Sequence, residues 1–352
     1  MRILVRATNW VGDAVMSLPA LQVLRERFRD AHIAVLARPW VADIYAREPF
    51  ADELIAYTAG RGWRDSGSKL KLAAELRRRK FDMAVLLQNA FEAAALVWLA
   101  GIPRRIGYDR DARGFLLTDA IAVPKSGEIP AHQRFYYLEL LRRAGIVDAL
   151  PEWPAIRLSC AHRAAEAGRA RFAEKGWSRI TGVSPGAAFG TAKRWLPERF
   201  ASAAADLGNP VALFGSGDER ELCEVIAEAI RRRGLEVWNC AGQTRLAEYI
   251  DLAAACSVYL TNDSGGMHIA SALGVATVAV FGATDHDATG PTGPLARIVR
   301  EPVDCSPCLL RECPIDHRCM TGVSTSSVVA VAQEVSGGFW PVGKAKSETG
   351  IE

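Results

Sequence analysis

The chain has 352 residues, of which 49% are hydrophobic and 24% charged, and its formal net charge is +3. This length exceeds one ordinary core, so two domains are expected, and so small a charge does not indicate a nucleic-acid-binding protein. The most apolar stretch, residues 83–102, contains Gln88, Asn89 and Glu92, which argue against a membrane span. A strand beginning at residue 2 leaves no room for a signal peptide, so we expect a cytoplasmic protein.

The first half of the chain alternates buried strand patterns with helical ones. Strands are expected at residues 2–7, 32–37, 53–57, 82–87 and 104–108, and helices at residues 14–28, 68–80, 91–99 and 132–144. Strands that alternate with helices predict a parallel sheet with right-handed crossovers. The stretch at residues 145–159 is interrupted by prolines and has no clear period, which indicates a domain boundary.

A second series of alternating elements follows this boundary. Helices are expected at residues 161–175, 197–206, 218–233, 245–255 and 265–273, and strands at residues 180–185, 211–215, 236–242, 258–263 and 276–282. A last helix near residues 324–335 has no clear assignment to either half. We therefore predict an α/β protein with two doubly wound, Rossmann-like domains facing across a cleft, at residues 1–155 and 156–340, and a polar tail at residues 341–352.

The apolar run that opens the chain is followed by "NWVGDAVMSLPAL", residues 9–21. A nucleotide-binding domain usually has a glycine-rich phosphate loop here, but this loop has one glycine, followed at once by Asp13. Two interpretations stay open. Asp13 either caps the helix expected at residues 14–28, or it faces the cleft from the wall opposite the phosphates and accepts a proton.

Residues 184–200, "SPGAAFGTAKRWLPERF", form a long loop of small residues after a strand. Small residues let a phosphate approach backbone N–H groups, and Lys193 adds a positive charge, with Thr191 beside it. The spacing is not that of a Walker loop. The alternative is an ordinary connection with a solvated lysine.

Residues 261–274, "TNDSGGMHIASALG", predict a helix whose N-terminus can receive an anion. Asp263 or Ser264 can cap this helix, and the amides of Ser264, Gly265 and Gly266 would point outward. A plain cap without a ligand is the alternative. His268 lies one turn into the helix, where it either lines the same pocket or is a buried structural histidine.

Two further patterns concern nucleotides and metals. The loop "FGSGDERE", residues 214–221, follows a strand and offers Glu219 or Glu221 as an acid that hydrogen-bonds ribose hydroxyls. It resembles only a fragment of a dinucleotide fingerprint. Two Asp-x-Asp pairs, at residues 109–111 and 285–287, are of the type that holds a divalent metal beside a diphosphate. Neither follows the phosphate loops, so no metal is expected there.

Eight cysteines fall into two groups. Four lie among apolar neighbours and are expected to be inert core residues: Cys160, Cys223, Cys240 and Cys256. The other four are clustered in "CSPCLLRECPIDHRC": Cys305, Cys308, Cys313 and Cys319. Bound zinc or iron, a disulfide and free thiols all stay open for this cluster, and His317 is a candidate extra ligand.

Basic clusters at residues 77–80, 103–105, 141–143 and 231–233 also have two interpretations. They are solvated helix ends, where cations suit the negative end of the helix dipole. Alternatively, they form a weakly basic face for an anionic partner or a membrane surface.

Taken together, the motifs at residues 9–21, 184–200 and 261–274 and the cysteine-rich segment resemble the bacterial ADP-heptose:lipopolysaccharide heptosyltransferases. The similarity runs over roughly residues 1–335. This is an inverting glycosyltransferase family with the GT-B fold. The opening motif and the cysteine-rich segment look most like its heptosyltransferase II branch, which adds the second heptose of the inner core.

The resemblance also implies roles for particular residues. Asp13 matches the general base toward the acceptor heptose hydroxyl, and Thr191 and Lys193 match the pair that contacts the donor diphosphate. Asp263 and the amides after it match the donor loop, and one of Glu219 and Glu221 should bind ribose. One departure is that the family often has two threonines in the lysine loop, whereas "GTAK" has only Thr191.

The substrates follow from the same resemblance. The expected donor is ADP-heptose, the expected acceptor is heptosyl-Kdo2-lipid A, and no divalent metal or nucleic acid is expected. The enzyme would work at the cytoplasmic face of the inner membrane as a peripheral protein. Alternatives are a related transferase with another acceptor or nucleotide sugar, a GT-B-fold sugar-nucleotide epimerase, and a non-enzymatic sugar-nucleotide binding protein.

Overall fold

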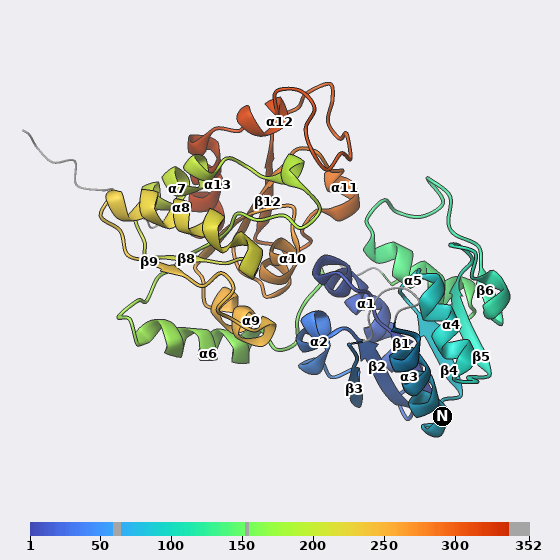
Figure 1. Ribbon diagram of the computed structural model, residues 1–352. Coiled ribbons are helices and arrows are strands. Elements are labelled where there is room, and N and C mark those ends of the chain that lie inside the picture. The colour runs from blue at the N-terminus through green and yellow to red at the C-terminus, as the bar shows by residue number, and fades with distance from the viewer. Residues whose placement is uncertain (59–64, 152–154, 338–352) are drawn as a thin grey trace, which may run out of the picture.

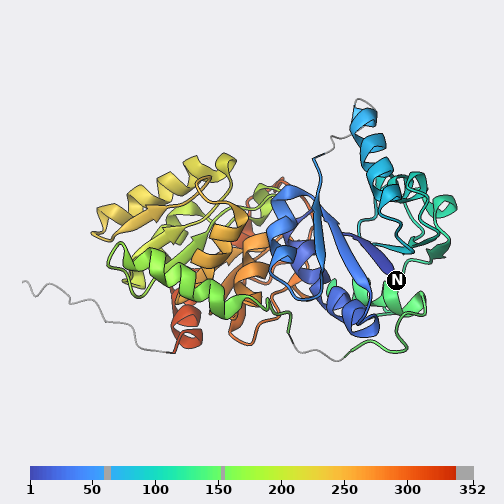
Figure 2. The same cartoon turned by 90° about the horizontal axis from the view of Figure 1, so that it is seen from below.

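A computed structural model describes residues 1–58, 65–151 and 155–337 and contains two α/β domains (Figures 1 and 2). Each domain has a parallel sheet of six strands, in the orders β3-β2-β1-β4-β5-β6 and β12-β11-β10-β7-β8-β9. The predicted fold class, two doubly wound domains, is confirmed. The tail expected at residues 341–352 lies outside the described residues.

In the N-terminal domain, helices cover both faces of the sheet. Helices α1, α2 and α5 share one apolar cluster with the sheet, and α3 and α4 share the cluster on the opposite face. The strands are β1 (Arg2–Arg6), β2 (His32–Ala37), β3 (Glu53–Ala56), β4 (Met83–Leu86), β5 (Arg104–Tyr108) and β6 (Asp119–Ile121). The helices are α1 (Val11–Arg27), α2 (Pro39–Ala46), α3 (Ser66–Arg78), α4 (Phe91–Leu99) and α5 (Arg134–Arg143), with a 3₁₀ turn η2 (Gly114–Leu116).

The C-terminal domain repeats this arrangement. Helices α6, α9 and α10 contribute to the apolar cluster that continues into the N-terminal domain, and α7, α8 and α13 cover the other face. The strands are β7 (Thr181–Ser184), β8 (Val211–Leu213), β9 (Val237–Asn239), β10 (Val258–Asn262), β11 (Thr277–Phe281) and β12 (Ala296–Arg300). The helices are α6 (Ala161–Ala173), α7 (Pro197–Asp206), α8 (Arg220–Arg232), α9 (Leu246–Ala254), α10 (Gly265–Ala272), α11 (His286–Thr289), α12 (Arg318–Thr321) and α13 (Thr325–Val335), with 3₁₀ turns η3 (Thr191–Lys193) and η4 (Gly217–Glu219).

Several elements were not predicted. Helix α2 begins at Pro39, only two residues after β2 ends, so the apolar pattern of the strand runs directly into that of the helix. The sequence therefore gives no separate signal for the start of α2. Strands β6 and β12 lie at sheet edges and are only partly buried, so they lack the continuous apolar run of the central strands. Helix α13 was predicted, but without an assignment to either half of the chain. It packs through Val328 and Ala332 into the C-terminal core.

The two domains are joined by more than the connecting chain. Helix α1 packs against α10, and α2 against α9, as Figure 1 also shows. Arg47, which follows the last residue of α2, forms an ion pair with Asp251 of α9. The buried Glu48 accepts hydrogen bonds from the backbone N and the hydroxyl of Ser159, both at 2.8 Å. These contacts set the orientation of the two sheets across the cleft.

Candidate functional site

A cavity of about 770 Å³ lies between the two domains, beyond the carboxyl ends of β1, β7 and β10. Its position is the one expected for ligands of open α/β sheets. The N-terminal domain contributes the loop and first turn of α1 together with Trp40. Predicted site residues from both domains meet here: Asp13, Lys193, Glu219, Asp263, Ser264, Gly265, Gly266 and His268 line this cavity.

Asp13 lies in the first turn of α1 rather than at its cap. The helix begins at Val11, because the backbone N of Ala14 donates to Trp10 O at 2.8 Å, so Trp10 occupies the cap position. The interpretation of Asp13 as a helix cap is therefore wrong. Burial raises the pKa of the Asp13 carboxyl, and a hydrogen bond from Tyr137 of α5 and the charge of Lys193 oppose that rise. A carboxylate with a raised pKa is a better proton acceptor.

Lys193 reaches the cavity from η3 and is held by a carboxylate. Its Nζ lies 2.6 Å from Oδ2 of Asp263, which also accepts a 2.6 Å hydrogen bond from the Thr284 hydroxyl. Both side chains of the ion pair are largely buried, at 13% and 5% exposure. The interpretation of a freely solvated lysine is therefore wrong, and Asp263 orients the ammonium group.

The N-terminus of α10 has no side-chain cap. Ser264 occupies the cap position without such a hydrogen bond, and the carboxylate of Asp263 is occupied by Lys193 and Thr284. The plain-cap interpretation is wrong for both residues. The first N–H groups of a helix have no partner within the helix, so those at Gly265 and Gly266 remain available at the positive end of the dipole.

The paired glycines also have a packing role. A Cβ on Gly265 would lie 2.8 Å from Cβ of Val11 in the other domain, and one on Gly266 would lie 2.7 Å from the hydroxyl of Tyr249. Gly265 therefore allows α10 to touch α1 directly, and Gly266 allows it to approach α9. Close packing alone therefore explains the two glycines, with no bound anion. The backbone N–H groups at this helix start are still available to an anion.

His268 lines the cavity, as one of its two interpretations has it, and it is also buried, at 5% exposure. A Cβ on Gly12 would lie 3.0 Å from its Cδ2, so the ring packs against the first turn of α1. Burial lowers the pKa of His268 to about 4, with the charge of Asp263 opposing this. The imidazole is therefore neutral at pH 7.

The structure separates Glu219 from Glu221. Glu219 ends η4 and lines the cavity, and its Oε2 accepts the backbone N of Ser216 at 2.9 Å. A side chain on Gly186 would collide with the Glu219 carboxylate, which places this acid against the lysine loop. Glu221 lies in the first turn of α8, exposed and outside the cavity lining, and Thr191 is likewise exposed and outside it.

Sequence reasoning missed Arg311, which also lines the cavity. It lies in residues 305–317, which we call the cysteine strap. Its carbonyl accepts the backbone N of Ala192 at 2.9 Å, and Nε2 of His317 donates to Ala192 O at 2.9 Å. The strap therefore packs on the lysine loop. The cysteines of this segment indicated only metal ligands. Its arginine was the signal that could have indicated an anion-binding residue.

The four cysteines expected in the core are buried: Cys160, Cys223, Cys240 and Cys256. Burial raises the pKa of Cys223 and of Cys240 to about 12. Cys319 of the clustered group is buried as well. Within the clustered group, burial and the three neighbouring thiols raise the pKa of Cys319. No disulfide joins them. In the described part of the chain, no three of these sulfurs lie within 4.8 Å of one another.

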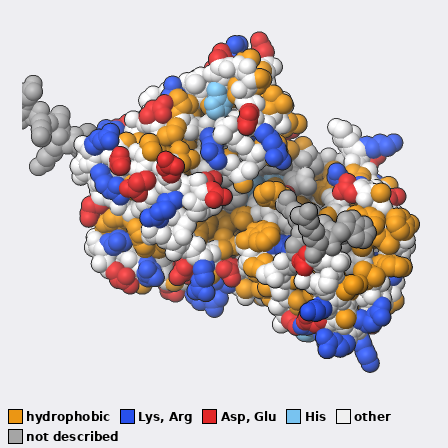
Figure 3. All heavy atoms as spheres, viewed as in Figure 1, with side chains coloured by type: hydrophobic (Ala, Val, Ile, Leu, Met, Phe, Trp, Pro, Cys, Tyr) orange, Lys and Arg blue, Asp and Glu red, His pale blue; other side chains and the backbone are white. Residues whose placement is uncertain are grey.

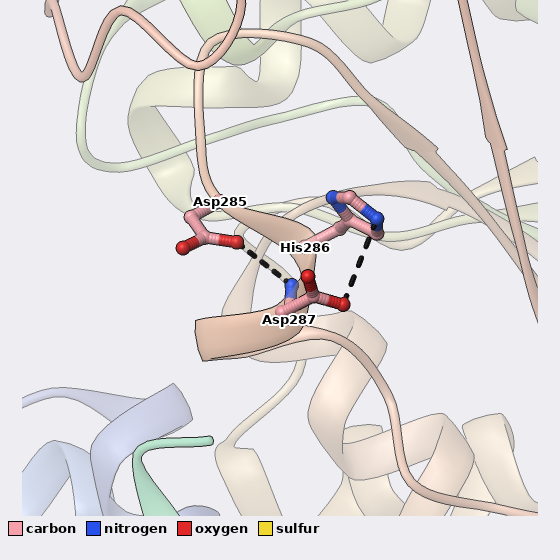
Figure 4. A group of neighbouring side chains, drawn as sticks. All are labelled: Asp285, His286 and Asp287. Carbon is pink, nitrogen blue, oxygen red and sulfur yellow. Dashed lines mark hydrogen bonds and ion pairs between the residues drawn. The ribbon is translucent and has the colours of Figure 1, made fainter. Parts of the chain in front are cut away.

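Among the described residues, potential metal-ligand atoms of one group of side chains do lie close together: those of Asp285, His286 and Asp287 (Figure 4). Asp285 caps the four-residue helix α11 by accepting the backbone N of Asp287 at 2.9 Å. His286 lies 3.7 Å from the Asp287 carboxylate. The arrangement is therefore explained by helix capping, and it does not line the cavity.

Comparisons with known proteins agree with this geometry. The family model for glycosyltransferase family 9 (heptosyltransferase) matches residues 69–318. The chain is 34% identical over 311 residues to lipopolysaccharide heptosyltransferase 2 of Escherichia coli, covering 85% of this chain and 88% of that protein. It is 33% identical over 308 residues to lipooligosaccharide heptosyltransferase 2 of Haemophilus influenzae, with the same coverage.

Solved structures lead to the same family. The structure of E. coli ADP-heptose lipopolysaccharide heptosyltransferase II superposes with a TM-score of 0.80 and 30% identity, covering 96% of this chain and 98% of that one. The resemblance identified from the sequence motifs is thereby confirmed. The chain belongs to glycosyltransferase family 9, the heptosyltransferases.

Proposed function

We propose that this protein transfers L-glycero-D-manno-heptose from ADP-heptose to the heptosyl-Kdo2-lipid A inner core of lipopolysaccharide. Family membership supports glycosyl transfer, and similarity to heptosyltransferases named 2 or II supports this donor and acceptor. One observation carries the proposal for the site. A buried carboxylate, Asp13, and an oriented cation, Lys193, reach a single cavity from opposite domains.

The reaction is a single displacement that inverts the anomeric carbon. The acceptor hydroxyl oxygen forms a bond to that carbon while the bond to the β-phosphate oxygen breaks, and ADP leaves with the electron pair. Asp13 accepts the hydroxyl proton. A positioned general base contributes about 10²–10⁴-fold, and the raised pKa of Asp13 suits this role.

Negative charge grows on the departing diphosphate, and the C-terminal domain is built to stabilise it. Lys193 supplies a charge held in place by Asp263, and the amides at the start of α10 supply the positive end of a helix dipole. Preorganised groups of this kind cost no reorganisation during the reaction. We assign the ribose hydroxyls of the donor to Glu219, which lies on the η4 turn and lines the same cavity.

The lipid anchor of the acceptor requires the enzyme to reach a membrane surface. No helix in the described segments has the length and apolar composition to cross a membrane. We assign contact to the cytoplasmic face of the inner membrane to the N-terminal domain, where hydrophobic side chains gather (Figure 3). Phe91 and Trp98 of α4 and Phe115 of η2 are 45%, 51% and 77% exposed there.

Incubation with ADP-heptose and heptosyl-Kdo2-lipid A tests the function directly. The expected product is heavier than the acceptor by one heptose, as measured by mass spectrometry. Extension of Kdo2-lipid A that lacks the first heptose would assign a different acceptor. Conversion of the nucleotide sugar to an epimer, with no lipid product, would replace the proposal with the epimerase alternative.

A further inference from the structure

Charge in the donor site is the starting point for a further inference, which rests on the proposed function. A diphosphate leaving group carries more than one negative charge, but the one lysine in the cavity lining is already paired. Lys193 Nζ lies 2.6 Å from Asp263, so much of its charge is neutralised before a ligand arrives. The helix dipole of α10 adds only about half a charge. The site therefore needs another cation.

Arg311 is the described arginine that lines this cavity. Its Cζ lies 5.3 Å from the ring centroid of Phe189, and Nζ of Lys193 lies 5.1 Å from the same centroid. Phe189 itself lines the cavity. The two cations are thus placed around one aromatic ring at the lysine loop, where the diphosphate is expected to bind.

The backbone fixes Arg311 at this position. Ala192 N donates to its carbonyl at 2.9 Å, and a side chain on Gly190 would collide with that same carbonyl. His317 Nε2 closes the contact from the far end of the strap by donating to Ala192 O at 2.9 Å. The strap therefore cannot shift without moving the lysine loop.

We propose that Arg311 binds the diphosphate of the donor as the second cation of the site. The lysine loop has only Thr191, where the family often has two threonines. The backbone of Ala192 in this loop holds the segment that delivers a guanidinium group. A guanidinium group donates two parallel hydrogen bonds to phosphate oxygens, which adds geometric selectivity that a lysine lacks. Through this contact the cysteine strap becomes part of the donor site.

Binding of ADP and adenosine to Arg311→Gln, measured by calorimetry, tests this role. We expect ADP affinity to fall about 10- to 100-fold, the range for a lost hydrogen bond to a charged group, while adenosine affinity stays at the parent value. Arg311→Lys should recover only part of the loss. Arg318→Gln is the matched control, because Arg318 follows the strap, is exposed, and pairs with Asp316 outside the cavity.

Each outcome has a definite meaning. If Arg311→Gln binds ADP as tightly as the parent, the inference is wrong and the proposed function stands. Equal losses for ADP and adenosine would also overturn it, since they would point to general damage to the pocket. If the parent protein itself binds neither ADP nor ADP-heptose, the proposed function fails first. Thermal unfolding of each variant separates lost binding from lost folding.

Discussion

The two domains have the same sheet topology, but they differ in chemistry where they face each other across the cleft. We call these facing parts the N-terminal edge, where α1 begins, and the C-terminal edge, where α10 begins. The start of α1 carries an acid, Asp13, in its first turn, whereas the start of α10 carries two glycines and no acid. Asp13 complements the dipole of its own helix, and the dipole of α10 is left for a ligand. The comparison teaches that two helix starts beside central strands, α1 after β1 and α10 after β10, take different roles, because a few loop residues make one a base and the other an anion site.

The largest effect should come from removing the acid of the N-terminal edge. Asp13→Asn keeps the shape of the side chain and eliminates proton acceptance, so kcat should fall about 10²–10⁴-fold while ADP affinity is retained. In the parent, activity should be lost as pH falls through the raised pKa of Asp13, because the protonated acid cannot act as a base. A steady-state assay across pH checks both points. Unchanged turnover in Asp13→Asn would show that Asp13 is not the base. The proposed chemical difference between the two edges would then be wrong.

Removing the cation of the C-terminal edge should have the next largest effect. Lys193→Met should lower kcat about 10²–10³-fold, the range for losing one preorganised electrostatic group, and should weaken ADP binding as well. Asp263→Asn is its matched control, because the lysine stays but loses its charged partner. We expect turnover to fall in Asp263→Asn while ADP affinity does not. A parallel fall in affinity would show that Asp263 does more than position Lys193.

The smallest predicted effect concerns stability at the contact between the two edges. His268 has a pKa of about 4 in the folded protein, below its ordinary 6.5, so the unfolded chain binds its proton more readily. The free energy of unfolding should therefore fall as pH drops from about 6.5 to 4, by at most roughly 3 kcal/mol. Chemical denaturation at several pH values measures this.

A variant pair isolates the contribution of His268. In His268→Asn this acid-dependent component should disappear, whereas His162→Asn should retain it, because the His162 side chain is 86% exposed. A pH dependence that is identical in His268→Asn and in the parent would mean that the α1–α10 contact is open to water.

Much of this arrangement was predictable from local patterns. Central strands such as β1 and β10 contain short apolar runs, and Asp13, Lys193 and Gly265 each follow a central strand, so topology alone brings them to one cleft. The family resemblance and the fold class were confirmed for the same reason. Each of their signals is a short, local stretch of sequence.

The rest depends on contacts between segments far apart in the chain. Glu219 and Glu221 cannot be distinguished until the turn η4 fixes which one faces Gly186. The pairing of Lys193 with Asp263 joins residues 70 positions apart, and Arg311 reaches the cavity only because its strap bonds to Ala192. No pattern of spacing or periodicity contains this information.

The contact between α1 and α10 has a mechanical consequence. Val11 packs on Gly265, and the ring of His268 packs beside Gly12, so a side chain from each helix start lies against a glycine of the other. The spacing between the two helix starts is therefore set by two missing side chains. A larger residue at Gly265 would meet Val11 at 2.8 Å and would force the two domains apart at this point.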